Sequence, residues 1–190
     1  PKLAPASLAQ LQLPEDWPAM MPGCATLLNL VHARTLPKKF PFPGPQDAER
    51  RDRPAYYYSQ SSVIPYRIRE GQLEILIVGS SKMKHWVVPK GIAEPGLSPQ
   101  DSAAKEANEE AGVEGVVDPE AIGSYRYEKW GAVCTVEVFP MQVRREIPET
   151  QWQESHRRRE WVTAEQAAKR VRQTELVAII NALQQKLAAN

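Results

Sequence analysis

The sequence predicts an α+β fold in which a mixed β-sheet lies between helices, as an α/β/α sandwich. Strand-like apolar segments bounded by turn residues fill much of the chain after residue 55. One strongly capped helix begins near residue 98, and an apolar stripe at helical spacing follows near the C-terminus. Strands and helices do not alternate regularly, which argues against a doubly wound parallel sheet.

Composition narrows the class of protein. The chain has 190 residues, 42% of them hydrophobic and 25% charged, with a formal net charge of +1. This length suits one domain with an appendage, and the small net charge argues against a general nucleic-acid or membrane binder. No apolar run approaches the roughly 20 residues of a membrane span. Cys24 and Cys134 lack metal-ligand spacing, so we expect a reduced, cytoplasmic chain.

The first 55 residues differ from the rest. They carry a large share of the 17 prolines, including the run FPFPGP, which the charged run DAERRDRP follows. Such a density of proline disfavours helix interiors and central strands. We therefore predict a proline-rich arm or linker over residues 1–55 and the main domain over residues 56–190. Within the arm, ATLLNLVHA favours one short buried strand or helix, and its length does not decide between them.

The main domain begins with a predicted hairpin. The segment SSVIPYRIREGQLEILIVGS indicates two strands joined by a turn at Glu70-Gly71. Strand alternation places Arg67 and Arg69 on one face of the first strand. LEILIVG is apolar on both faces, which predicts a central strand, and WVVP predicts a third short strand that ends at Pro89.

The C-terminal part predicts further strands and then helices. IGSYRYEKW and AVCTVEVF indicate a hairpin around Gly131, and REWV predicts a short last strand. Thr163 and Gln166 have the spacing of a capping box at a helix start. An apolar stripe at helical spacing follows, formed by Leu176, Ile179, Ile180, Leu183 and Leu187.

Between these regions lies a helix rich in alanine and glutamate. Ser98, Pro99 and Asp101 predict its start, and Gly112 predicts its end. Alanines at 103, 104, 107 and 111 share one arc, which lets this helix lie close to a sheet.

Three glutamates share a neighbouring arc of the same helix: Glu106, Glu109 and Glu110. Stacked like charges cost a few tenths of a kcal/mol per pair, and acids near a helix C-terminus oppose the macrodipole. A divalent cation relieves both penalties, and oxygen ligands suit Mg²⁺ or Mn²⁺. Gly91, which follows a predicted strand, would let a backbone carbonyl approach the same cation. From spacing alone, an acidic solvated helix face is the alternative.

Residues 91–113, GIAEPGLSPQDSAAKEANEEAGV, resemble the Nudix box. That pattern is Gly, five residues, Glu, seven residues, then Arg-Glu-aliphatic-any-Glu-Glu-any-Gly-aliphatic. Three positions depart from it, because Leu97 replaces the first Glu, Lys105 replaces the Arg and Ala107 replaces a larger aliphatic residue. The matching positions are Gly91, Glu106, Glu109, Glu110, Gly112 and Val113.

The resemblance implies a metal-dependent hydrolase of phosphoanhydride bonds. In the family, the first Glu and the Arg join the loop to the helix, whereas the later glutamates bind metal. Because both partners of that contact are replaced here, we expect packing of Leu97 to hold the loop and the box to remain active. The implied catalytic residues are Glu106, Glu109 and Glu110, and the same three with Gly91 would hold Mg²⁺ or Mn²⁺. Glu154 and Glu137 are candidates for a proton acceptor outside the helix.

The resemblance also suggests a branch of the family. SSKMKHWVVPKG and WQESHRRREWVTAEQAAKRV are similar to segments of diphosphoinositol polyphosphate phosphohydrolases. An anionic small molecule of the diphosphoinositol polyphosphate or diadenosine polyphosphate type is then the expected substrate, and the run 157–159 would add positive charge around it. No membrane or nucleic-acid partner is expected, and a homodimer is left open. The candidate substrate-binding residues are Arg67, Arg69, Ser80, Ser81, Lys82, Lys84 and Lys90.

Two other functions remain open at this point. One is a Nudix-fold module that binds such a ligand or a protein without catalysis. The other is removal of pyrophosphate from RNA 5′ ends, which would need a base-stacking site such as Tyr125, Tyr127 and Trp130.

Overall fold

The computed structural model describes residues 7–13, 21, 23–32, 40–42 and 49–188. The chain divides into two compact units, Pro1–Phe40 and Pro41–Asn190. Within the described ranges, no helix combines the length and the apolar character needed to cross a membrane.

The first unit contains a hairpin that the sequence predicted only in part. Strands β1 (Ser7–Gln12) and β2 (Thr26–His32) pair antiparallel, with an irregularity between Gln10 and Leu11. The segment ATLLNLVHA is therefore a strand. Its expected burial is wrong, because Leu27 and Leu28 are 53% and 54% exposed. A two-stranded ladder has no second layer of its own to cover such side chains. A separate two-stranded ladder pairs β3 (Phe40–Phe42), which begins at the last residue of the first unit, with β4 (Glu49–Arg51) of the second unit.

The second unit is built on an eight-stranded mixed sheet. Strand β11 pairs parallel with β5, and the other ladders of this sheet are antiparallel. The main path runs β10 (Gly123–Lys129), β11 (Ala132–Glu146), β5 (Ser59–Arg69), β6 (Gln72–Gly79) and β12 (Arg159–Thr163). Three short strands pair off this path: β7 (Trp86–Val87) with β6, β8 (Lys90–Ile92) with β5, and β9 (Val113–Val117) with β11.

Both predicted hairpins are confirmed, with two-residue turns. Glu70 and Gly71 join β5 to β6 with φ of 53° and 78°. Trp130 and Gly131 join β10 to β11 with φ of 54° and 75°. Two consecutive positive φ values characterise the type I′ turn, whose twist matches that of the flanking strands.

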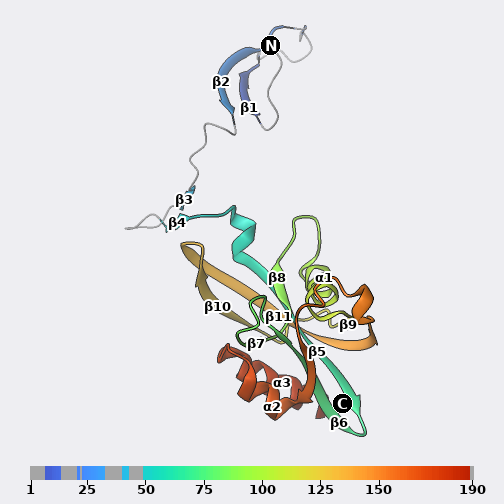
Figure 1. Ribbon diagram of the computed structural model, residues 1–190. Helices are drawn as coiled ribbons and strands as arrows, with labels where there is room; N and C mark the ends of the chain where they lie inside the picture. The colour runs from blue at the N-terminus through green and yellow to red at the C-terminus, as the bar shows by residue number, and fades with distance from the viewer. Residues whose placement is uncertain (1–6, 14–20, 22, 33–39, 43–48, 189–190) are drawn as a thin grey trace. The chain divides into compact units, whose positions relative to one another are not determined.

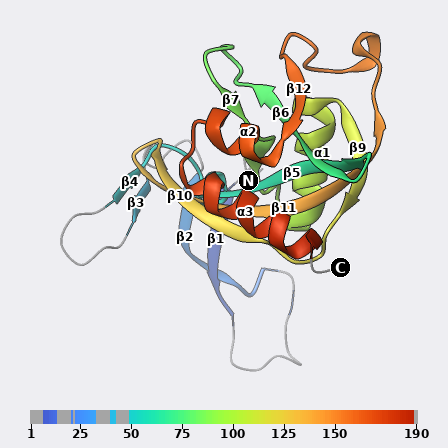
Figure 2. The same cartoon turned by 90° about the horizontal axis from the view of Figure 1, so that it is seen from below.

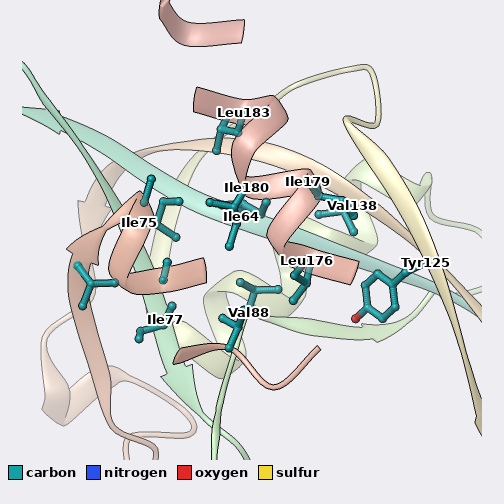
Figure 3. Close-up of a cluster of buried hydrophobic side chains, with 14 of the residues drawn as sticks. Ile64, Ile75, Ile77, Val88, Tyr125, Val138, Leu176, Ile179, Ile180 and Leu183 are labelled. Carbon is teal, nitrogen blue, oxygen red and sulfur yellow. The ribbon is translucent and has the colours of Figure 1, made fainter. Parts of the chain in front are cut away.

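Helices cover both faces of this sheet (Figures 1 and 2). Helix α1 (Pro99–Ala111) lies on one face, and α2 (Ala164–Arg170) and α3 (Glu175–Ala188) lie on the other. Adjacent residues of β5 face opposite sides of the sheet. Val63 packs with the alanines of α1, and Ile64 packs with α3. In Figure 3, Leu176, Ile179, Ile180 and Leu183 of α3 point towards the sheet residues Ile64 and Val138. The predicted α/β/α sandwich is confirmed.

Candidate active site

Helix α1 has the start and the end that its sequence predicts. The Ser98 hydroxyl accepts a hydrogen bond from the Asp101 N–H at 3.0 Å, and Pro99 occupies the first helical position. Gly112 ends the helix with φ of 60°, and its N–H bonds back to Asn108 O. The helix buries Ala103, Ala107 and Ala111 completely against the sheet. Glu106, Glu109 and Glu110 are consequently half-buried on the adjacent face.

Two side chains from the last part of the chain cap the acidic end of α1. Trp152 Nε1 donates to Glu109 O at 2.9 Å. Arg159 Nη1 donates to Ala111 O at 3.0 Å and to Gly112 O at 2.8 Å. A cation here offsets acids that oppose the helix dipole. Arg159 therefore stabilises the end of the helix. In the sequence, it was placed only in a basic run that would add positive charge around the substrate.

Glu106 lies directly against Gly91. A Cβ atom built on Gly91 would come within 1.8 Å of Glu106 Oε1, so only glycine leaves room for this carboxylate. Burial, followed by the negative charges of Glu110 and Glu109, raises the pKa of Glu106 to about 7. Ser61 faces Gly91 across the β5–β8 ladder, and its buried hydroxyl has no hydrogen-bond partner among the described residues.

Glu110 is held by a backbone donor and a buried cation. Lys90 N–H donates to Glu110 Oε2 at 3.0 Å, and Arg157 Nη2 donates to Oε1 at 2.7 Å. Arg157 also donates to Glu154 and, at 3.2 Å, to Gly79 O. Burial raises the pKa of Glu110, and the charge of Arg157 opposes that rise. Glu154, expected as an outside proton acceptor, thus belongs to the same ionic cluster.

The oxygen atoms of this cluster are of the type that binds a divalent cation. Carboxylate oxygens and a backbone carbonyl are the ligands that Mg²⁺ and Mn²⁺ prefer. The close approach of Glu106 to Gly91 and the unpartnered hydroxyl of Ser61 mark a polar centre at this point. Over the described part of the chain, no three His, Cys, Asp or Glu side chains already converge as a metal-ligand set. Arg157 holds one of the required carboxylates, so cation binding would require this ion pair to rearrange.

The loop before α1 is held by an ion pair, where we had expected apolar packing. Lys105 Nζ bonds to the Glu94 carboxylate and lies 3.9 Å from a Glu109 oxygen. The Glu94 N–H also donates to the Ser102 hydroxyl at 3.1 Å. Leu97 is 43% exposed, so the expected packing of Leu97 is wrong. The loop acid that meets the helix base lies three positions earlier than in the family pattern.

Three of the predicted substrate-binding residues line one basic hollow of about 290 Å³: Ser80, Ser81 and Lys90. Glu110 and Arg157 form part of its wall. Sequence reasoning missed Lys129 and Arg172, which also line it and come from the end of β10 and the α2–α3 connection. No local pattern pointed to either, because only the fold brings these segments together.

Lys90 is positioned inside this hollow by neutral partners. Its Nζ donates to Tyr127 Oη at 3.0 Å and to Gln60 Oε1 at 3.3 Å, and the Tyr127 hydroxyl donates to Gln60 at 2.7 Å. Burial lowers the pKa of Lys90. This network uses the Tyr127 hydroxyl, and Tyr125 is buried in the core beneath α3, so the expectation that Tyr125 could stack a base is wrong.

The other candidates lie elsewhere. Arg67 bonds to Glu74 at 2.6 Å and to Glu146 at 3.1 Å, and it stacks on Trp161. Arg69 is exposed at the turn end of β5, and Lys84 lines a separate small hollow beside Arg158. Lys82 and Glu137 are exposed. The functional roles of Arg67, Arg69, Lys82, Lys84 and Glu137 stay predictions.

Comparison with known proteins identifies the domain. Residues 59–180 match the model of the NUDIX domain. Nudix hydrolase 21, chloroplastic, from Arabidopsis thaliana is 31% identical over 120 residues, which cover 60% of this chain and 59% of that protein. Nudix hydrolase 18, mitochondrial, from the same plant is 30% identical over 135 residues, covering 66% of this chain and 75% of that protein.

Solved structures share the fold at lower identity. The crystal structure of a C. elegans Ap4A hydrolase gives a TM-score of 0.57 at 22% identity, covering 68% of this chain and 98% of that one. The solution structure of the E. coli ORF135 protein gives 0.52 at 20% identity, covering 70% and 93%.

Proposed function

Because this chain belongs to the Nudix family, we propose that it is a divalent-metal-dependent pyrophosphohydrolase acting on a highly phosphorylated small molecule. One observation carries the proposal. Two carboxylates of one helix are held at adjacent backbone positions, Glu106 against Gly91 and Glu110 on the Lys90 N–H, beside a hollow lined by basic side chains. Such a site combines negative ligands for a cation with positive contacts for phosphate.

The substrate class that we propose is a diphosphoinositol polyphosphate or a dinucleoside polyphosphate. The segments that resemble diphosphoinositol polyphosphate phosphohydrolases support the first, and the fold shared with an Ap4A hydrolase is compatible with the second. Lys90, Lys129 and Arg172 supply the positive charge that either would need. The free cysteines suit a reducing compartment, so we place the reaction in the cytoplasm.

Each residue of the site has a chemical task in this proposal. When bound, a divalent cation would neutralise phosphate oxygens and lower the pKa of a water molecule. Lys90, fixed by Tyr127 and Gln60, presents a positive charge to the phosphate chain. Glu106, which lies against Gly91, would be one of the carboxylates that hold the cation. Glu154 is our candidate for the proton acceptor outside the helix, because it shares Arg157 with Glu110.

The test is turnover with a matched control. Purified protein is incubated with Mg²⁺ or Mn²⁺ and a panel of diphosphoinositol polyphosphates, diadenosine polyphosphates, ADP-ribose and capped RNA. Metal-dependent phosphate release that is lost in Glu109→Gln/Glu110→Gln and kept in Glu165→Gln supports the proposal. Glu165 is an exposed glutamate of α2, paired with Lys169 and remote from α1 in sequence. Metal-independent ligand binding without any turnover would instead make the chain a binding module, and turnover of capped RNA alone would favour RNA 5′ processing.

A further inference from the structure

Ser61 of β5 carries a buried hydroxyl group to which the described residues offer no partner. Its side chain is 0% exposed, and none of those residues forms a hydrogen bond with its Oγ atom. The next residue, Ser62, is equally buried, but its hydroxyl donates to Pro89 O at 2.8 Å. Buried polar groups in native proteins are nearly always hydrogen-bonded. We therefore expect the Ser61 hydroxyl to gain a partner when a ligand binds or a neighbouring side chain turns.

The Ser61 side chain faces the carboxylate helix. Residues of a strand alternate between its two faces, so Ser61 shares a face with Val63, which packs on the alanines of α1, and Ser62 lies on the opposite face. Across the β5–β8 ladder, Ser61 is paired with Gly91. Directly opposite residues of an antiparallel pair point to the same face, with Cβ atoms about 4.5–5.5 Å apart. The space that a side chain at position 91 would fill therefore lies next to Ser61.

The carboxylate of Glu106 occupies that space. A Cβ atom at Gly91 would overlap Glu106 Oε1, so this carboxylate takes the place of the cross-strand side chain opposite Ser61. Glu110 accepts two hydrogen bonds from other parts of the chain, whereas no described residue donates one to the Glu106 carboxylate. A donor without an acceptor and an acceptor without a donor thus lie side by side between β5 and α1.

We propose, resting on the metal-dependent function proposed above, that Ser61 is a positioning residue for the cation site. Its hydroxyl donates to the Glu106 carboxylate and fixes the orientation in which this carboxylate would hold the cation. Carboxylates that bind metal ions are themselves hydrogen-bonded to outer groups, which orient them and tune the site. A turn of the Glu106 side chain closes this bond. Position 61 lies outside residues 91–113, so the pattern of the box does not predict the role.

The first experiment measures cation affinity in the full chain. Isothermal titration with Mn²⁺ compares wild type, Ser61→Ala and the matched control Ser62→Ala, which removes a buried hydroxyl from the opposite face of the same strand. Loss of an outer partner of a metal ligand typically costs about 10- to 100-fold in metal affinity, so the Kd of Ser61→Ala should rise by that factor. The Kd of Ser62→Ala should match that of wild type.

Thermal unfolding in EDTA separates a positioning serine from a merely structural one. Ser61→Ala removes no hydrogen bond to another described residue, so its Tm should equal that of wild type. Ser62→Ala removes the bond to Pro89 O, so its Tm should fall. One variant then loses cation affinity and keeps its stability, and the other loses stability and keeps its affinity. A lower Tm for Ser61→Ala in EDTA would make this hydroxyl structural and overturn the proposal.

A crystal structure of the Mn²⁺-loaded protein tests the bond itself. Ser61 Oγ should lie about 2.5–3.0 Å from a Glu106 carboxylate oxygen. Equal Mn²⁺ affinity in wild type and Ser61→Ala overturns the proposal, as does a Ser61 hydroxyl that bonds only to other groups in the loaded protein. Metal-dependent turnover alongside either result keeps the hydrolase proposal. Mn²⁺ binding that depends on Ser61, without turnover of any phosphoanhydride, leaves Ser61 in this role and refutes the hydrolase.

Discussion

Arg157→Met tests whether this guanidinium is the internal counter-charge of the carboxylate cluster. The Arg157 side chain is 7% exposed and that of Glu110 is 14% exposed, with 2.7 Å between the bonded atoms. Methionine keeps most of the apolar length, so the change removes charge and hydrogen bonds more than packing. Removing one partner of a buried ion pair costs about 3–5 kcal/mol. Glu110 keeps its bond from the Lys90 N–H and borders a hollow, so we expect about 2–3 kcal/mol.

The assay is unfolding by urea and by heat, near neutral pH and in the presence of EDTA. For a domain of this size, the expected loss corresponds to a fall in Tm of about 4–12 °C. The control is a double-mutant cycle with Glu110→Gln, which removes the charge that Arg157→Met leaves unpaired. The double variant should recover about 1–2 kcal/mol relative to the sum of the single changes, because the two residues are in direct contact.

Adding Mg²⁺ tests whether Arg157 acts as a counter-charge for Glu110 or has a purely structural role. A divalent cation can replace the guanidinium beside Glu110, so Mg²⁺ should stabilise Arg157→Met more than it stabilises wild type. Titration should also show tighter Mg²⁺ binding by the variant, since Arg157 no longer competes for the carboxylate. A variant as stable as wild type in EDTA, or an equal response of both to Mg²⁺, would refute the reasoning.

Three further predictions concern the same centre. The pKa of Glu106 rises from 4.5 to about 7 on folding, so the folded state keeps a proton that the unfolded state loses, and stability falls as pH rises through this window. In EDTA, Glu106→Gln should abolish that fall and be about 1–2 kcal/mol more stable than wild type above the window, after discounting for solvent screening; parallel pH profiles of unfolding would contradict this. Gly91→Ala places a methyl group where Glu106 Oε1 lies, so kcat/KM should drop about 100-fold, and unchanged turnover would remove Gly91 from the site. Glu94→Gln breaks a half-exposed pair with Lys105, so thermal unfolding should report a loss below about 1 kcal/mol that shrinks with salt, and a larger loss would mean that the loop depends on this pair alone.

Features encoded by adjacent residues were predictable from the sequence. The turns at Glu70-Gly71 and Trp130-Gly131 and the cap at Ser98 depend on local chemistry, and the structure has all three. Strands β8 and β9 were missed because each is short and pairs with a strand far away in the sequence. Strand β11 was predicted too short for the same reason, since β9 and β5 extend it to Glu146.

The site shows the same division between local and distant contacts. Spacing along one helix was enough to place Glu106, Glu109 and Glu110 on one face. It could not show that Arg157 lies on Glu110, because 47 positions separate them. It could not show that Tyr127 holds Lys90 either, because 37 positions separate that pair and β10 must first dock in the sheet.

The ion pair that joins the loop to α1 lies at a different position in this chain than in the family pattern. The family pattern places the loop acid at position 97, where Leu97 is exposed, whereas Lys105 here pairs with Glu94. An acid at position 94 can still anchor the loop to α1. Glu94 also lines a hollow of about 350 Å³ beside Tyr56 and Glu106, which the exposed Leu97 does not. The ion pair that joins the loop to α1 therefore borders the same hollow as Glu106, one of the carboxylates proposed to hold the cation. The shift of three residues therefore keeps the loop joined to α1, and the carboxylates that would hold the cation stay on one face of that helix.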